Sequence, residues 1–434
     1  MLQSLLKLIY QNNIMPVLDT GILICIKYSI MNKEGNMLPF GRMIKYGNIA
    51  PGPSPVAFSD VLQQHYTNCM YLHTPTNTLY GYGNNNLCQL GVGNQSIVST
   101  FTVLARGCAA FWLGVHGSLM IDLDNRIYYT GSGAAFPDYG DATLVNGFMT
   151  QWTDVTVAFN KIGVIANMIK SVHIGESTRI LLTDGRVIAC GKNTYGECGS
   201  GNTNAIPTLT VMTDMGEVSQ LACSLQGTHY LKTNKDAWFC GKDNVGASGC
   251  GAAGVVHLNK LVTSNVEYIS ATYDITWWFI RGGYVYYSGS NSFAQAGNGT
   301  FSSTNQLRPT RNLDLASIVV DDNFVCPSNM GNSSIGTPMA KYDPNIRSGG
   351  VNTYGQEGTG NNNIVTKWNT FNISAITGGF DNILMASKDW CRTIIITKDY
   401  KVYACGGFNG SGGILPDGTY AIKTLTLMPT QQWQ

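Results

Sequence analysis

The chain has 434 residues and a formal net charge of +1 at pH 7; 12% of its residues are charged and 50 are glycine. The charged fraction is about half of the ~25% that is usual in soluble domains. The chain also has no basic run, so it lacks the positive stripe that binding to a phosphate backbone requires, and we expect no nucleic-acid partner. An uncharged polar surface is typical of a protein that is packed in an assembly or faces the outside.

The first 58 residues differ from the rest of the chain. Two apolar segments, 21–30 and 37–46, are separated by a turn-like stretch at 32–36. A proline-rich link follows at 51–55. This order predicts an extended arm joined by a stiff linker. The first apolar segment is too short to span a membrane, and the first twenty residues have no signal-peptide cleavage pattern. We therefore expect an arm and linker over 1–58, no membrane insertion, and synthesis in the cytoplasm.

From residue 59 onward a glycine pattern recurs seven times, in steps of 48 to 61 residues. The leading glycines of the seven copies are Gly83, Gly131, Gly191, Gly241, Gly289, Gly350 and Gly406. A period of about 50 residues indicates a propeller or a solenoid.

Each copy also carries a turn residue six positions before its leading glycine: Asn77, Asn125, Gly185, Lys235, Gly283, Pro344 and Tyr400. β-branched and aromatic runs flank the turn, as at 179–182 and 187–190, and predict a hairpin. A third strand precedes the hairpin and a fourth follows the glycines, as at 172–174 and 208–211. Four antiparallel strands per period, without a helical pattern, predict an all-β fold: a seven-bladed β-propeller with four-stranded antiparallel blades over 59–434.

The regular copies resemble a known repeat. Residues 83–93 and 191–201 follow the signature Gly-x-Asn-x-x-Gly-Gln-Leu-Gly-x-Gly of the regulator of chromosome condensation repeat family, and residues 89–93 match its second half closely. The resemblance covers roughly residues 60–430 and implies a propeller. The low charge, the richness in glycine and asparagine and the apolar arm favour a bacteriophage-encoded member of the family. The family's link to chromatin and to nucleotide exchange is not carried over, because no basic tail or exchange motif is present. The fold-defining glycines are Gly83, Gly91, Gly93, Gly191, Gly199, Gly201, Gly241, Gly289, Gly297, Gly350 and Gly358.

Reactive motifs are not found in the sequence. The run Gly249–Gly254 has dinucleotide-type spacing but belongs to the repeat, and His173 and His229 are interpreted as structural. Three of the 12 cysteines, Cys190, Cys240 and Cys405, each precede a leading glycine in a different blade. They are therefore expected to be free, buried and structural. We predict that the protein is not an enzyme and binds no cofactor and no metal.

The longest steps follow Gly131 and Gly289, so the excess residues there are expected to project as loops. The first insertion, 134–152, is rich in aromatic residues. Exposed aromatic side chains serve interfaces, which makes this segment a candidate partner-binding surface. The alternative is a satellite hydrophobic cluster beneath a long loop. The candidate residues are Phe136, Tyr139, Phe148 and Trp152.

These observations predict a non-enzymatic protein-interaction propeller. The first hypothesis is a structural or receptor-binding subunit of a virion, such as a phage tail, neck or fibre component, assembled in the host cytoplasm. Its partners would be other subunits, contacted through the arm, and a host surface receptor. The alternative is a cytoplasmic bacterial propeller that binds or inhibits a single protein partner. An enzyme or exchange factor is the third and least supported hypothesis.

Overall fold

The computed structural model describes residues 61–65, 67–140, 144–272, 274–280, 284–313, 340–342, 345–408, 413, 415–429 and 433. The chain divides into two compact units, 1–42 and 43–434, and all described residues belong to the second. The predicted arm and linker, and their boundary at residue 58, lie outside the described residues.

The described residues form antiparallel sheets whose strands are hydrogen-bonded in chain order. Blade 1 comprises β1 (Leu62–His65), β2 (Asn68–His73), β3 (Thr78–Gly83) and β4 (Val98–Arg106); blade 2 comprises β5 (Cys108–Leu113), β6 (Gly117–Asp122), β7 (Ile127–Ser132) and β8 (Phe148–Asp154). Blade 3 comprises β9 (Ile169–Ile174), β10 (Ser177–Leu182), β11 (Val187–Gly191) and β12 (Ile206–Val211).

Blade 4 comprises β13 (Val218–Cys223), β14 (Gly227–Lys232), β15 (Ala237–Asp243) and β16 (Val255–Thr263); blade 5 comprises β17 (Tyr268–Ala271), β18 (Ile275–Ile280), β19 (Tyr284–Asn291) and β20 (Ser302–Arg311). A three-stranded sheet follows, with β21 (Ala340–Tyr342), β22 (Asn345–Gly350) and β23 (Val365–Thr370). Blade 6 comprises β24 (Ile383–Lys388), β25 (Arg392–Thr397), β26 (Val402–Gly406) and β27 (Ile422–Leu427).

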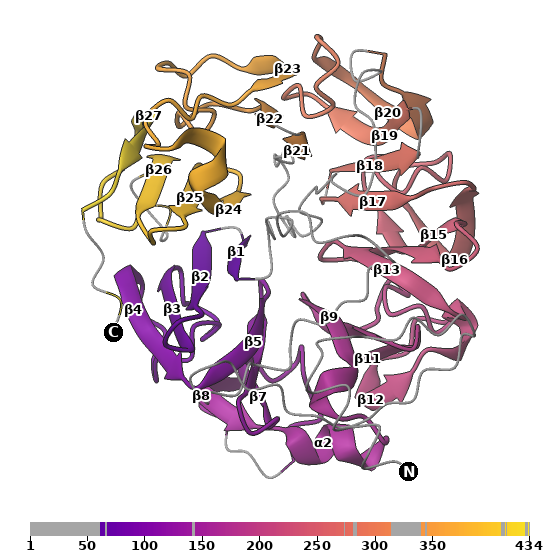
Figure 1. Ribbon diagram of the computed structural model, residues 1–434. Coiled ribbons are helices and arrows are strands. Elements are labelled where there is room, and N and C mark those ends of the chain that lie inside the picture. Colours follow the sequence, from indigo (N-terminus) through magenta and orange to yellow (C-terminus); the bar gives the residue numbers. More distant parts are fainter. Residues whose placement is uncertain are drawn as a thin grey trace, which may run out of the picture. The chain divides into compact units, whose positions relative to one another are not determined.

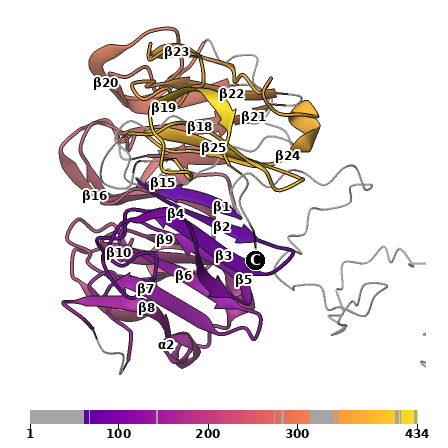
Figure 2. The ribbon, with the colours of Figure 1, turned by 90° about the vertical axis from the view of Figure 1, so that its left-hand side faces the viewer.

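The sheets are arranged in a ring, with the first strand of each blade innermost and the fourth outermost (Figure 1). Figure 2 shows the same sheets from the side. Inner strands touch in the pairs β1 with β5, β5 with β9 and β13 with β17. β24 contacts β1, so the last blade meets the first. Side chains between successive sheets form the core, as in the cluster where blades 2 and 3 meet. The propeller fold predicted from the repeat is thereby confirmed.

The prediction of seven four-stranded blades needs correction. The structure has six four-stranded blades and one sheet with three described strands. Gly350 ends β22 as Gly83 ends β3, so β21, β22 and β23 correspond to the second, third and fourth strands of a blade. The residues that precede this sheet, 314–339, lie outside the described residues. The long step after Gly289, predicted to be a loop, falls on this segment.

The predicted turn positions are confirmed where the structure describes them. Five of them have the positive φ angles that tight hairpin turns require: Asn77, Asn125, Gly185, Lys235 and Tyr400. Gly283 and Pro344 lie outside the described residues. The ten cysteines that the structure describes are all free and buried, as predicted.

Helical structure is a minor part of the fold. The excess residues after Gly131 form α2 (Thr156–Lys161) and the 3-10 turn η2 (Ala166–Met168). The sequence predicts a projecting loop within 134–152, but the excess follows β8 and forms a helix, whose Ala158 and Phe159 are buried between blades 2 and 3. Further 3-10 turns are η3 (Thr213–Met215) and η4 (Gly379–Asn382). In the part of the chain that the structure describes, no helix has the length and hydrophobicity of a membrane span.

The ring closes through an aromatic contact that the sequence analysis did not foresee. The Trp433 ring lies 4.9 Å from both Tyr71 and Tyr80 of blade 1, measured between ring centroids. The Trp433 indole N–H donates a 2.9 Å hydrogen bond to the carbonyl of Tyr400 in blade 6. Nearby, Arg392 of blade 6 donates a 3.0 Å bond to the Gln64 side chain of blade 1. The C-terminal tryptophan therefore joins the last blade to the first.

Candidate interaction face

One end of the ring is built from two kinds of connection. These are the hairpins between the first and second strands of each blade, and the glycine-signature loops between the third and fourth strands. Backbone bonds hold the two together, as where Asn84 N–H donates to Thr67 O within blade 1 at 3.2 Å. Because the blades repeat, equivalent residues lie on the same side of the ring. We call this side the loop face.

Each signature loop begins at a glycine that no other residue can replace without strain. The seven leading glycines all have φ between 90° and 123°. At Gly83 a Cβ atom would also fall on the carbonyl oxygen of Thr67, at the start of the neighbouring strand. The repeat therefore requires glycine both for its backbone conformation and for the close approach of two backbones.

The asparagine two positions later holds the loop in shape. In blade 3, Asn193 Oδ1 accepts the N–H of Cys198 at 2.9 Å, and its Nδ2 donates to the carbonyls of Asn202 and Asn204. Buried Asn85, Asn291 and Asn352 make the equivalent bonds in their own loops. A buried amide that bonds across the loop replaces the missing sheet hydrogen bonds, so these loops are ordered and not flexible.

Other signature positions bind each loop to the next sheet in the ring. Gln89 Nε2 donates to Val115 O of blade 2 at 3.2 Å, and Ser118 Oγ returns a 2.7 Å bond to Gln89 O. The last glycine of the signature donates its N–H to the outer strand of the next sheet, each time at 2.8 Å. These pairs are Gly93 with Thr150, Gly251 with Leu307, Gly299 with Thr366, and Gly360 with Lys423. The signature thus joins sheets as well as shaping loops.

One signature position points an apolar side chain outward. Four residues after the leading glycine stand Leu87, Tyr195, Val245, Phe293 and Tyr354, all partly exposed. Since they occupy equivalent places, they lie around the loop face at similar intervals. Lys242 lies over the Tyr195 ring at 4.9 Å, a cation–π contact.

Three rings gather on the loop face where the three-stranded sheet meets blade 6. Tyr354, Trp390 and Phe408, here called the aromatic cluster, lie 5.1 to 5.4 Å from one another, measured between ring centroids. Each is partly exposed. Gln356 Nε2 donates a 2.6 Å bond to Trp390 O and fixes the backbone beneath the rings. A rigid, half-exposed aromatic group of this kind suits protein contact.

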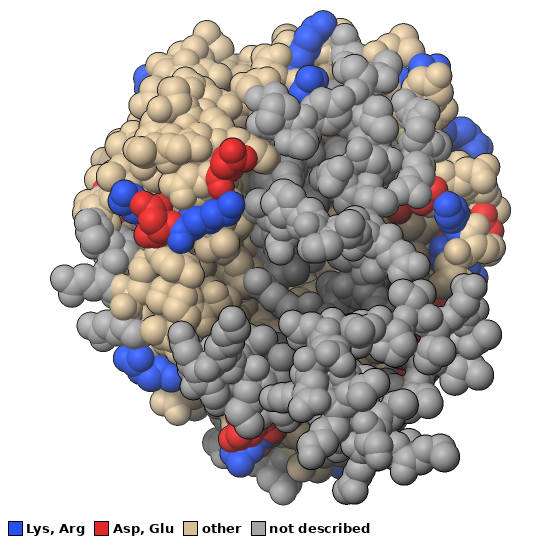
Figure 3. Space-filling view, viewed as in Figure 1, with Lys and Arg blue, Asp and Glu red and all other residues tan. Residues whose placement is uncertain are grey.

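Charges around the ring are few and of both signs. On the loop face Lys192 pairs with Glu176 at 3.4 Å. Figure 3 shows one face of the molecule, and among the described residues on it several acidic and basic side chains lie close together with uncharged residues around them. This agrees with the uncharged polar surface expected from the composition.

The structure places the four predicted partner-binding aromatic residues in and beside the blade 2 core. Phe136 is fully buried, and its ring stacks at 4.8 Å on Tyr129, so it fills the core and is not on a surface. Tyr139 is half-buried against the same cluster. Phe148 and Trp152 belong to β8, the outer strand of blade 2, and not to a projecting loop. The Trp152 indole covers Gly91 of blade 1, which explains why that position is glycine.

The buried histidines have structural surroundings. His229 Nε2 lies 3.2 Å from Ala247 O and 3.3 Å from Thr276 Oγ1, as a hydrogen-bonded core residue does. Burial lowers the pKa of His229 to about 4 and that of His173 to about 3, so both are neutral at physiological pH. Across the described ranges, no group of three or more His, Cys, Asp or Glu side chains is placed to hold a metal ion.

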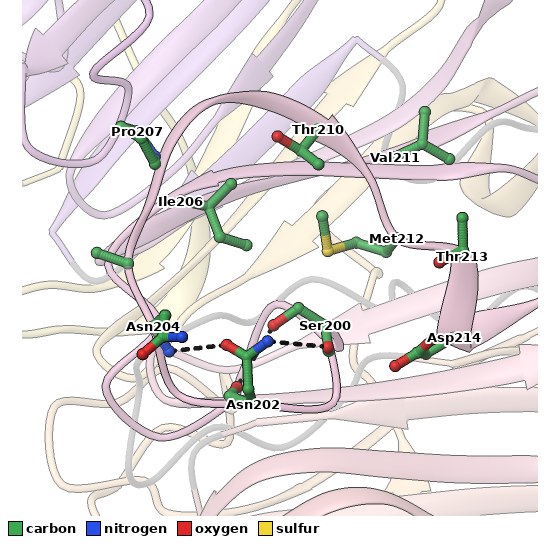
Figure 4. Close-up of a pocket in the computed structure, with 11 residues that line it drawn as sticks. Ser200, Asn202, Asn204, Ile206, Pro207, Thr210, Val211, Met212, Thr213 and Asp214 are labelled. Carbon is green, nitrogen blue, oxygen red and sulfur yellow. Dashed lines mark hydrogen bonds between the residues drawn. The ribbon is translucent and has the colours of Figure 1, made fainter.

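A hollow of about 230 Å³ lies beside the signature loop of blade 3 (Figure 4). The loop itself shapes it, since Asn202 Nδ2 donates to Ser200 O and its Oδ1 accepts the Asn204 N–H. Pro207, Val211 and Met212 form the apolar wall, and Asp214 is the one ionisable side chain among the lining residues. The hollow offers hydrogen bonds but no pair of groups for proton transfer.

The fold is similar to solved propellers, although no protein-family model matches the sequence. Yeast RCC1 (Prp20), solved bound to Kap60, has a TM-score of 0.65 at 14% identity, covering 90% of each chain. Prp20p from Saccharomyces cerevisiae, described with its binding properties to Gsp1p and histones, has a TM-score of 0.64 at 14% identity, covering 83% of this chain and 88% of that one. Human WBSCR16 has a TM-score of 0.62 at 14% identity, covering 81% and 95%. These likenesses support an RCC1-type propeller fold.

Proposed function

We propose that this chain is a non-enzymatic protein-interaction propeller that binds other proteins through its loop face. The observation that carries the proposal is the aromatic cluster, Tyr354, Trp390 and Phe408. Its rings are partly exposed and stand on loops that internal hydrogen bonds hold in place. A rigid aromatic surface loses little conformational entropy on binding, which favours a protein partner.

The similar structures support a binding role. The yeast propeller Prp20 is described in complex with Kap60 and with binding properties to Gsp1p and histones. The present chain shares that fold at 14% identity, so the kind of role is proposed and the partners are not.

The setting that we propose is a virion, with the chain as a structural or receptor-binding subunit of a phage tail, neck or fibre. The low charged fraction and the richness in glycine support a subunit whose surface is largely covered by neighbours. Assembly would take place in the host cytoplasm, and the partners would be other subunits of the particle and a host surface receptor.

The test is quantitative mass spectrometry of purified particles produced by the genome that encodes this chain. A fixed copy number per particle, retained through density-gradient purification, supports the virion setting. Absence from particles, with the chain recovered as a free monomer, contradicts it.

The alternative is a bacterial propeller that binds or inhibits one protein. The yeast propeller Prp20 favours this alternative, because it has been solved bound to the single protein Kap60. The two settings differ in stoichiometry: a single-partner inhibitor forms a complex of defined small mass, which size-exclusion chromatography with light scattering distinguishes from incorporation into a particle.

A further inference from the structure

In four signature loops, the side chain six positions after the leading glycine is a glutamine or a glutamate. This residue is Gln89 in blade 1, Gln295 in blade 5, Gln356 in the three-stranded sheet and Glu197 in blade 3. In all four, a side-chain oxygen accepts the backbone N–H of the residue two positions earlier, at 2.9 to 3.0 Å. The hydrogen bond that the side-chain oxygen accepts within its own loop is therefore the same for glutamine and glutamate.

The other half differs, because an ionised carboxylate has no hydrogen to donate. Gln89 Nε2 donates to Val115 O at 3.2 Å, and Gln356 Nε2 donates to Trp390 O at 2.6 Å. Each acceptor is the second residue after the end of the inner strand of the next blade, in the hairpin that leads to its second strand. The equivalent residue in blade 4 is Leu225. The second oxygen of Glu197, Oε1, is buried and has no hydrogen-bond partner among the described residues.

The first hairpin of blade 4 is hydrogen-bonded to Glu197 in the same way as the first hairpins of blade 2 and blade 6 are bonded to Gln89 and Gln356. Thr228 Oγ1 donates to Glu197 O at 2.7 Å. Ser118 donates to Gln89 O and Thr393 to Gln356 O at the same distance. This shared register matches residue 197 with the first hairpin of blade 4, as Gln89 and Gln356 are matched with theirs, and Leu225 O is the carbonyl equivalent to their acceptors.

Several ionisable groups face Glu197. From β10, Arg179 is attractive, but its guanidinium already donates to Gly227 O, Thr228 Oγ1 and Ser224 O of blade 4. From the hairpin of blade 3, Glu176 repels it, and the thiols of Cys198 and Cys240 lie near it. Burial is the largest effect and raises the pKa of Glu197 in spite of Arg179.

We propose that Glu197 is a proton-dependent link between blades 3 and 4. The protonated carboxyl donates its O–H to the Leu225 carbonyl, as Gln89 and Gln356 donate at their own interfaces. Gln295 is the exception, since its Nε2 has no hydrogen-bond partner among the described residues. The ionised carboxylate loses that bond and places a buried charge against a carbonyl dipole.

The sign of the pH dependence follows from linkage. The folded pKa lies above the ordinary value of 4.5, so between these two values the folded state holds a proton that the unfolded state has lost. The free energy of unfolding therefore falls as the pH rises from about 4.5 through the folded pKa. Below about 4.5 both states are protonated and the contribution of Glu197 is fully present.

Urea unfolding of the full chain between pH 4.5 and 8 tests the proposal with E197Q and its reciprocal Q356E. Burial also raises the pKa values of Asp243, Asp274 and Asp389, so the test is the difference between the variants and not the total decline. We expect the stability of E197Q to fall less with rising pH than that of the wild type and, at pH 8, E197Q to unfold with an equilibrium constant about tenfold smaller than that of the wild type. Q356E should gain a further decline over the same range, because it introduces the same carboxyl at the interface between the three-stranded sheet and blade 6.

Hydrogen exchange measured by mass spectrometry provides a local readout. In the wild type, residues 223–230 should lose protection as the pH rises, after correction for intrinsic exchange, and in E197Q they should not. The proposal is overturned if E197Q is less stable than the wild type at pH 8 or fails to fold, since either would mean that an ionised Glu197 paired with Arg179 supports the interface. It is also overturned if stability falls as steeply with rising pH in E197Q as in the wild type, or if Q356E falls no more steeply than the wild type.

Discussion

At the scale of single residues, glycine and asparagine of the signature shape the loops by different means. Glycine allows positive φ and close backbone contact, whereas asparagine supplies donors and an acceptor that the loop backbone needs. The two effects can be separated by substitution, because the chain holds positive-φ glycines that are crowded and others that are open.

Gly241→Ala should destabilise the protein by about 3 kcal/mol. Its φ is 115°, and a new Cβ would meet the backbone of Gln226 and Gly227. Gly254→Ala, in the same blade, is the matched control: its φ is 73° and no atom lies within 4 Å of the new Cβ. The control should cost only about 1 kcal/mol. Equal losses in urea unfolding would show that close approach does not matter at Gly241.

Asn193→Ala should cost about 3 kcal/mol, because it leaves the Cys198 N–H and the carbonyls of Asn202 and Asn204 without their partner. Asn193→Asp keeps the acceptor and loses the donors, so its loss should be intermediate. Thermal unfolding at pH 7 measures both. If alanine and aspartate behave alike, the amide donors contribute nothing.

At the scale of elements, the interfaces between sheets contain features that the repeat does not predict. One is the ion pair of Lys388 and Glu357, which is buried between blade 6 and the three-stranded sheet. Lys388 Nζ also donates to Ser348 Oγ at 2.9 Å. Glu357 occupies the position that Leu90 holds in blade 1, so an apolar residue can fill the same place.

Lys388→Met should therefore destabilise the protein by about 3–5 kcal/mol, because it leaves the Glu357 carboxylate buried and alone. The double variant Lys388→Met with Glu357→Leu should recover most of that loss, since the apolar pair resembles the other interfaces. A double-mutant cycle in urea supplies the comparison. A double variant as unstable as the single one would mean that the ion pair itself holds the interface.

Trp433→Ala should open the closure between blades 1 and 6 and cost about 3–5 kcal/mol. Trp433→Phe keeps an aromatic ring but loses the hydrogen bond to Tyr400 O. It should destabilise the protein by about 1 kcal/mol for that bond, and further because the smaller ring packs less well. Hydrogen exchange in β1 and β2 should rise in the alanine variant before other blades are affected. Uniform exchange in every blade would show that Trp433 does not close the ring.

The elements that the sequence could predict are those fixed by local chemistry. The sequence could predict turn residues such as Asn125 and Lys235 and glycines such as Gly83, because few residue types tolerate their positive φ angles. Phe136 and Trp152 could not be placed, because aromatic residues near an insertion suit a surface and an interblade core equally well. The aromatic cluster was missed for a similar reason: Trp390 and Phe408 join Tyr354 only after the three-stranded sheet and blade 6 have packed.

At the scale of the whole molecule, the proposed role depends on the loop face. The double variant Trp390→Ala with Phe408→Ala should weaken partner or particle assembly at least tenfold, while unfolding changes little, because both side chains are partly exposed. The matched control is Tyr284→Ala, a partly exposed ring outside the loop face. Sedimentation of assembled against free protein measures the effect. If both variants lose assembly equally, the loop face is not the binding surface.

The most direct measurement of the central claim is an electron cryomicroscopy map of the native assembly that contains this chain. The account predicts a closed ring in which β24 lies beside β1 and a neighbouring protein covers Tyr354, Trp390 and Phe408. An open spiral of sheets, or a closed ring whose loop face is bare while partners bind elsewhere, would contradict it.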